Sequence, residues 1–240
     1  MKIEKFFIGF VFCVFLYGNN VRGKNLDIIS PGSENIEVEQ EYFPVIGKYN
    51  GNDKELKLTV NNSSVNTVKL EKGNIFTDKI KLNAGLNELK ITNGADVRTI
   101  NIFYETDNKN GQQNYKKYFL HAPILDNECS ECHTKEAKEN FPAVDQSKVV
   151  CFNCHDSFEK DKFIHGPIAS GSCQACHEPH GSTENKFLRE NKNKICYMCH
   201  EEESIKKEHL VNLKDNREEC SFCHNPHSGK DKFFLKETKK

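Results

Sequence analysis

The cysteines of this chain constrain its fold more than any other feature. Eleven cysteines occur in 240 residues, and all except Cys13 belong to five C-x-x-C-H motifs in the C-terminal half. The motifs are Cys129/Cys132/His133, Cys151/Cys154/His155, Cys173/Cys176/His177, Cys196/Cys199/His200 and Cys220/Cys223/His224. Hydrophobic residues make up only 36% of the chain and Trp is absent, a thin supply for two ordinary cores. The cysteine-rich half therefore needs disulfides, metal or a covalent cofactor in place of an apolar core.

C-x-x-C-H is the attachment signature of c-type haem. Two thiols three positions apart can reach the two vinyl groups along one porphyrin edge as thioethers, and the next histidine then lies under the iron as a ligand. We expect five covalently bound haem c groups, one on each motif. Zinc sites and a disulfide scaffold are the alternatives, but neither requires a histidine after every second cysteine. A thioredoxin-like redox motif would need a surrounding βαβ pattern, and none is apparent.

The chain has ten histidines, so five lie outside the motifs. They are His121, His165, His180, His209 and His227. Five haems need five second axial ligands, and Met198, the only non-initiator Met, lies inside a motif. Because methionine ligation raises the haem potential, its absence predicts bis-histidine, low-spin haems of low potential. His180 and His227 follow a proximal histidine by three positions, so we expect them to ligate neighbouring haems. Which extra histidine serves which iron is left open by the sequence.

The cysteine-rich half is internally repeated. Residues 119–133 align without a gap on residues 163–177, and residues 207–224 form a looser third copy. A second element, beginning C-H-x-P-H, recurs at 176–188 and 223–235. The prolines of these elements are expected to set turns that aim the adjacent histidines, and the phenylalanines to pack on the porphyrins. These residues are Pro123, Pro167, Pro179, Pro226, Phe119, Phe163, Phe187 and Phe234.

Residues 1–23 have the pattern of a secretory signal peptide. Lys2 and Lys5 precede an apolar run from Phe6 to Tyr17, which is short for a bilayer span, and a cleavage site is predicted before Lys24. An uncleaved anchor is the alternative. We expect an exported protein, periplasmic or at the cell surface and extracellular, with no transmembrane segment after signal removal.

Residues 24–106 contain neither Cys nor His. Short runs of alternating apolar residues, separated by turn pairs such as Asn61-Asn62 and Asn93-Gly94, predict an antiparallel β-sandwich. Residues 107–118 are polar and rich in turn formers, and they are expected to be a linker. The domain of residues 119–240 is expected to consist of short helices and loops packed around the haems.

Two resemblances accompany these patterns. The run VNNSSVNTVKLEKGNIFTDKIKLNAGLNELKITN resembles bacterial immunoglobulin-like domains, which implies an Ig-like spacer or docking module without chemistry of its own. The H-x-P…C-x-x-C-H-x-P-H runs resemble the cytochrome c3-like multihaem family with doubled motifs. That resemblance implies closely packed haems, bis-histidine ligation and electron relay. The first repeat departs from it, since no histidine stands at position 136.

Three functions are compatible with these features. An electron-transfer protein, not an enzyme, is the leading hypothesis, because the ligand count leaves no open iron position. The alternative is a multihaem reductase or oxidase of a small nitrogen or sulfur compound, with His209 as the first candidate for a non-ligand. In the third, the β-domain docks the cytochrome to a surface, a partner or another copy of itself. The net charge of -1 does not favour nucleic acid, and the expected partners are redox proteins.

Overall fold

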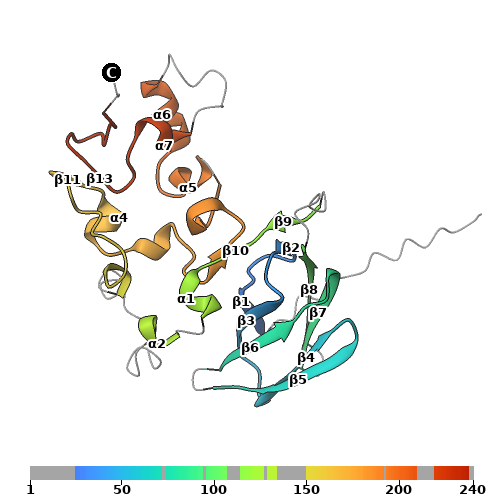
Figure 1. Ribbon diagram of the computed structural model, residues 1–240. Helices are drawn as coiled ribbons and strands as arrows, with labels where there is room; N and C mark the ends of the chain where they lie inside the picture. Colours follow the sequence, from blue (N-terminus) through green and yellow to red (C-terminus); the bar gives the residue numbers. More distant parts are fainter. Residues whose placement is uncertain are drawn as a thin grey trace, which may run out of the picture.

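The computed structural model describes residues 25–71, 74–93, 96–106, 114–126, 129–133, 150–191, 193–209 and 219–237. The predicted signal peptide and residues 107–113 of the predicted linker lie outside this set. Figure 1 shows a β-structure beside a region of short helices and loops. This arrangement agrees with the expected combination of an all-β part and a helix-and-loop part.

The N-terminal part consists of two sheets. One has the strand order β1-β3-β6, and the other has the order β5-β4-β7-β8-β2-β9. The strands are β1 (Leu26–Ser30), β2 (Asn35–Val38), β3 (Tyr42–Tyr49), β4 (Glu55–Val60), β5 (Ser63–Lys69), β6 (Ile75–Lys81), β7 (Gly85–Asn93), β8 (Asp96–Tyr104) and β9 (Lys116–Lys117). Alternating residues of both sheets form one buried apolar cluster, in which Phe43, Phe76 and Ile100 have no exposed surface.

Local sequence explains two of the turns. Asn61 and Asn62 join β4 to β5 with φ values of 53° and 63°, a left-handed conformation that asparagine tolerates better than most residues. Before β7, Gly85 has a φ of 87° and the buried Asn87 donates hydrogen bonds to the Asn83 and Gly85 carbonyls. The run that resembles immunoglobulin-like domains therefore does form strands joined by tight turns.

The expectation of a purely antiparallel sandwich is wrong for one strand. β2 pairs in parallel with β8 and with β9, whereas the other pairings are antiparallel. The chain leaves β1 in one sheet and enters β2 in the other, so β2 does not meet its neighbours through a hairpin and is free to run parallel. The sequence did not indicate β1, β2 or β3, where Pro44 interrupts the pattern.

Residues after the β-structure form short elements. They are β10 (Phe119–Leu120), α1 (Ala122–Leu125), α2 (Cys129–Cys132), β11 (Phe163–Ile164), α4 (Gly166–Ala169), η1 (Cys173–Ala175), β12 (Gly181–Ser182), η2 (Asn185–Phe187), α5 (Lys194–Tyr197), α6 (Glu202–Glu208), α7 (Cys220–Cys223) and β13 (Ser228–Gly229). Among the described residues, the buried apolar cluster contains none beyond Leu120. The described C-terminal part thus has no protein core of its own, as the sequence predicts for a region built around a cofactor.

Tyr118 joins the two parts. Its N–H donates to the Glu37 carbonyl at 2.8 Å, and its ring packs edge-on against Phe43 with centroids 5.9 Å apart. Its hydroxyl lies 3.2 Å from the Ser30 hydroxyl, and only 3% of the residue is exposed. β9 and Tyr118 lie in the segment expected to be a linker, so the part of that segment that the structure describes is integrated into the β-structure.

We predict that Tyr118→Ala lowers the free energy of unfolding by about 3–5 kcal/mol, the usual cost of truncating a buried aromatic residue. The matched control is Tyr42→Ala, because Tyr42 is 47% exposed and should cost less than about 1 kcal/mol. Denaturant unfolding of the full chain, followed by far-UV circular dichroism, measures both. Equal losses would contradict the packing role of Tyr118.

Candidate haem sites

Each of the five motifs is one helical turn. In every motif the N–H of the histidine donates to the carbonyl of the first cysteine four residues earlier. These five bonds are His133–Cys129 (2.8 Å), His155–Cys151 (2.9 Å), His177–Cys173 (3.0 Å), His200–Cys196 (2.9 Å) and His224–Cys220 (2.9 Å). A helical turn puts residues three apart on the same face, so both thiols face the same side and the histidine follows directly. The local geometry suits attachment along one porphyrin edge.

The structure pairs every motif histidine with one extra histidine. The pairs, with centroid separations and interplanar angles, are His133–His180 (6.0 Å, 11°), His155–His121 (6.1 Å, 11°), His177–His227 (6.3 Å, 18°), His200–His165 (6.0 Å, 13°) and His224–His209 (6.0 Å, 67°). No histidine is used twice. Four pairs have nearly parallel rings, and the last is strongly tilted.

These separations fit an ion held between two imidazoles. Metal–nitrogen bonds to histidine are about 2.0 Å long and a ring nitrogen lies roughly 1 Å from its ring centroid, so two imidazoles on opposite sides of one ion have centroids roughly 6 Å apart. Among the described residues, no group of three or more His, Cys, Asp or Glu side chains could hold a metal ion. Each pair thus supplies two axial ligands and leaves the other positions to a group such as a porphyrin.

Backbone carbonyls orient several of the rings. The Nδ1 atoms of His177 and His224 lie 2.8 Å and 2.6 Å from the carbonyl oxygens of Lys186 and Phe233. The Nδ1 atoms of His165 and His209 lie 2.9 Å from those of Pro226 and Ile205. A carbonyl only accepts, so Nδ1 carries the proton in these four rings and the Nε2 lone pair is left for a metal.

Burial keeps the extra histidines neutral. It lowers the pKa of His180 to about 4, with smaller contributions from His133 and His121. Burial also lowers the pKa of His121 and of His227, again helped by their paired motif histidines. A neutral imidazole is the form that ligates metals.

The two copies of the repeat have the same geometry. His121 and His165 each precede a short helix, α1 or α4, that contains proline in its first turn. The His121 N–H donates to the His180 carbonyl at 3.2 Å, and the His165 N–H donates to the His227 carbonyl at 3.0 Å. These bonds extend the equivalent strand pairs β10–β12 and β11–β13. The predicted role of Pro123 and Pro167 in setting turns beside the histidines agrees with this arrangement.

Phe187 and Phe234 occupy equivalent places beside the extra histidines. Both have left-handed backbones, with φ values of 58° and 59°, which are uncommon for a bulky residue. Phe187 contacts the His121 ring edge-on at 5.2 Å, and Phe234 contacts the His165 ring in the same way at 5.5 Å. The same strained conformation in both copies indicates that each ring is held there to fix a histidine.

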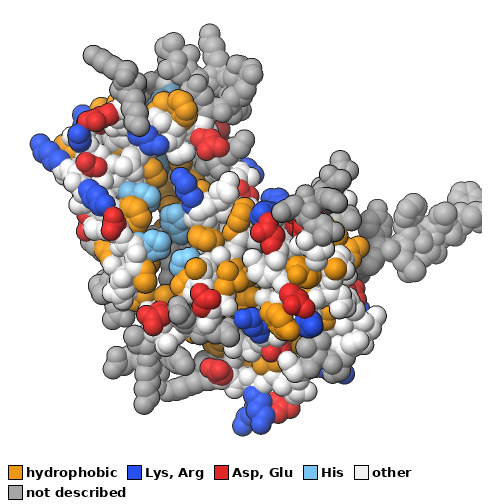
Figure 2. All heavy atoms as spheres, viewed as in Figure 1, with side chains coloured by type: hydrophobic (Ala, Val, Ile, Leu, Met, Phe, Trp, Pro, Cys, Tyr) orange, Lys and Arg blue, Asp and Glu red, His pale blue; other side chains and the backbone are white. Residues whose placement is uncertain are grey.

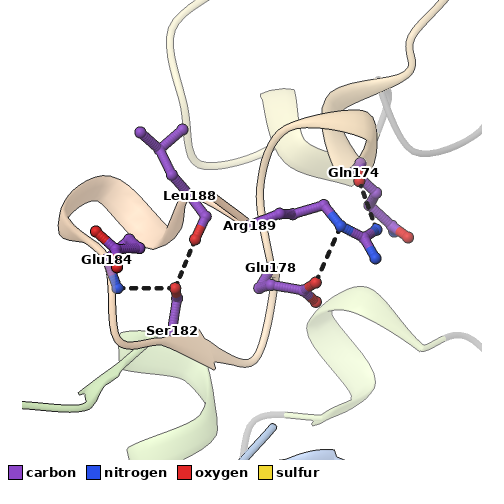
Figure 3. Close-up of polar contacts among 6 residues, drawn as sticks. All are labelled: Gln174, Glu178, Ser182, Glu184, Leu188 and Arg189. Carbon is purple, nitrogen blue, oxygen red and sulfur yellow. Dashed lines mark hydrogen bonds and ion pairs between the residues drawn. The ribbon is translucent and has the colours of Figure 1, made fainter. Parts of the chain in front are cut away.

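Polar contacts fold the loop that carries His180 (Figure 3). The Ser182 hydroxyl donates to the Leu188 carbonyl at 2.6 Å and accepts the Glu184 N–H at 2.9 Å. The Arg189 guanidinium lies 3.1 Å from the Glu178 carboxylate and donates to the Gln174 carbonyl at 3.0 Å. The sequence did not single out these residues, because a serine, an arginine and a glutamate in a loop carry no distinctive pattern.

The ten motif cysteines form no disulfides. Burial raises the pKa of the Cys132 and Cys176 thiols. It raises the pKa of Cys151 to about 11 and that of Cys196 to about 12, with further contributions from Cys173 and Cys220 respectively. Such thiols stay protonated at neutral pH, unlike the thiolates of metal sites and redox enzymes.

Histidine side chains gather on the C-terminal half, and Figure 2 shows them among hydrophobic side chains beside the β-structure. All ten predicted cysteines and all ten predicted histidines lie within the described residues. The structure describes no helix that is long and apolar enough to cross a membrane.

Similarity to solved structures is confined to the β-structure's size range and is weak. The chain is similar to an FMN-binding β-glucuronidase from Facaelibacterium prausnitzii L2-6 (17% identity, 34% of this chain and 12% of that one). It is also similar to fibronectin(III)-like modules of Clostridium thermocellum CbhA (12% identity, 34% and 97%) and to an endo-β-1,4-mannanase from Thermotoga petrophila (13% identity, 38% and 22%). Each TM-score is 0.28, too low to establish the fold. No curated protein matches the chain.

A family model described as the doubled CXXCH motif matches residues 121–160 and 165–205. Each match begins at an extra histidine, His121 or His165, and spans two of the five motifs. The doubled motifs, formed as helical turns with a histidine opposite each motif histidine, indicate that the protein is a multihaem c-type cytochrome carrying covalently bound haem c.

Proposed function

We propose that the protein is an exported pentahaem c-type cytochrome that relays electrons through bis-histidine, low-spin haems of low potential. The observation that carries the proposal is the one-to-one pairing of five motif histidines with five extra histidines at 6.0–6.3 Å. Haem iron supplies one-electron exchange when bound. Two imidazoles per iron leave no position for a substrate, so the chain's own residues serve to hold, orient and space the redox groups.

Two features of the residues support low potentials and unchanged ligation. Methionine ligation would raise the potential, but the thioether-bearing Met198 lies inside a motif and is 54% exposed. Carbonyls that accept the Nδ1 protons of His165, His177, His209 and His224 hold these rings in one tautomer. Fixed ligands need little rearrangement when the iron changes oxidation state, which favours rapid electron exchange.

For the β-structure we propose an immunoglobulin-like spacer or docking role. The sequence resemblance and the two-sheet arrangement support it. Because Tyr118 is buried in the β-structure, this part would set the position of the first haem relative to whatever surface it meets. Redox proteins are the proposed partners, in the periplasm or at the cell surface. Haem propionates would make the holo-protein more acidic than its formal charge of -1, so encounters should weaken as salt increases.

We expect protein made in a host with cytochrome c maturation to carry five haems by intact mass. All five should be low-spin in the ferric state by absorption and electron paramagnetic resonance (EPR), and cyanide or nitrite should not bind. A single high-spin ferric haem that binds either ligand would instead support the reductase or oxidase. Colourless protein, or protein holding zinc, would overturn the haem assignment.

The pairing of His180 with His133, in place of the nearby His177, can be tested directly. We expect His180→Ala to convert one haem to high spin, because the iron on the first motif loses a ligand. The same change in a Cys129→Ala/Cys132→Ala background should add no high-spin signal, since that haem is already missing. In a Cys173→Ala/Cys176→Ala background the signal should persist. The reverse pattern in ferric EPR would show that His180 serves its own motif.

The tilted pair should be spectroscopically distinct. The angle between two axial imidazole planes changes the splitting of the iron d orbitals, so the haem between His209 and His224 (67°) should give a low-spin EPR line different from the other four (11–18°). His209→Ala should remove that line and leave the others. His165→Ala, which opens a parallel pair, is the matched control and should leave the distinct line in place.

A further inference from the structure

Thiols of different motifs lie in contact, and they do so in a regular order. The Cys151 side chain hydrogen-bonds to Cys173, which joins the second motif to the third. The Cys196 side chain hydrogen-bonds to Cys220, which joins the fourth motif to the fifth. A further bond supports the second contact, since the Cys220 N–H donates to the Asn193 side-chain oxygen at 2.7 Å.

The remaining contacts join the other consecutive motifs. Cys132 and Cys154 lie close enough for a charge on one thiol to raise the pKa of the other, which links the first motif to the second. Cys176 and Cys199 are related in the same way and link the third motif to the fourth. First cysteines thus meet first cysteines and second cysteines meet second cysteines, in alternation along the chain.

Backbone contacts place the extra histidines in the same order. His121 and His180 are joined by a backbone hydrogen bond and lie opposite the histidines of the second and first motifs. His165 and His227 are joined in the same way and lie opposite the histidines of the fourth and third motifs. Figure 1 shows α2, α4, α5 and α7 following one another from bottom to top along the C-terminal half.

We propose that these contacts string the five haems in single file in the order of their motifs, with the haems on Cys129/Cys132 and Cys220/Cys223 at the two ends. Because each thioether marks an edge of its porphyrin, touching sulfurs bring the edges of consecutive haems together. Electron tunnelling falls steeply with distance, so consecutive haems exchange fastest. The inference rests on the proposed pentahaem relay and adds a direction to it.

The electron balance is simple. One electron enters at a terminal ferric haem from an external one-electron reductant, a redox protein of lower potential. It passes from each ferrous haem to the next ferric one, and no bond forms or breaks. At the other end an external one-electron oxidant takes it. The β-structure lies beside the first motif's end, through β10 and α1, and the last motif's end is formed by α7.

Iron positions in crystals of the wild-type holo-protein, located by anomalous scattering at the iron absorption edge, test the order without any substitution. We expect one row in which the nearest neighbours of each iron carry adjacent motif numbers. A first iron closer to the third than to the second, or a branched cluster, would overturn the proposal. Ligand states do not enter this measurement, so it can fail while all five haems are low-spin, and it can succeed if one is open.

A pair of four-haem proteins tests the consequence for electron flow. Cys173→Ala/Cys176→Ala removes the middle haem and should abolish the fast redistribution of electrons along the chain after pulsed reduction. Cys220→Ala/Cys223→Ala removes an end haem by matched substitutions and should keep that fast phase. Intact mass and far-UV circular dichroism confirm four haems and an intact fold. Equal redistribution in the two variants would overturn single-file order.

Discussion

The C-terminal half depends on imidazole pairs formed between distant parts of the chain. His180 lies opposite His133, and His227 lies opposite His177, so each C-H-x-P-H element reaches back to an earlier motif. An iron bound by both members of such a pair would tie two segments together more firmly than their few apolar contacts can. Metal binding that depends on a folded ligand set contributes its free energy to folding. The cofactor would therefore take the place of the core that this half lacks.

The surrounding protein serves this pairing in several layers. The helical turn of each motif presents two thiols and a histidine together, and carbonyls such as those of Pro226 and Lys186 fix ring tautomers. Phe187 and Phe234 adopt unfavourable backbone angles to lie against His121 and His165. Strain of this kind persists where the surroundings over-determine it. The β-structure has a conventional core and anchors the chain through Tyr118, directly before the first histidine pair begins.

The fifth pair differs from the others in ways that share one cause. His209 lies at the C-terminal end of α6, and its Nδ1 donates to the Ile205 carbonyl within the same helix. His121 and His165 instead follow short strands that pair with β12 and β13. A ring held by its own helix takes its orientation from that helix, which accounts for the tilt of 67° relative to His224.

The sequence alone determined the chemistry. Ten cysteines and ten histidines in fixed spacing specify attachment and ligation, because each motif is a local helical turn whose geometry depends on neighbouring residues only. Alternation also predicted the strands from β4 to β8. Only the tertiary structure decided that β2 runs parallel, that Tyr118 belongs to the β-core, and which histidine faces which. Those features join residues far apart in sequence, such as His133 and His180, and no local pattern encodes how two distant segments meet.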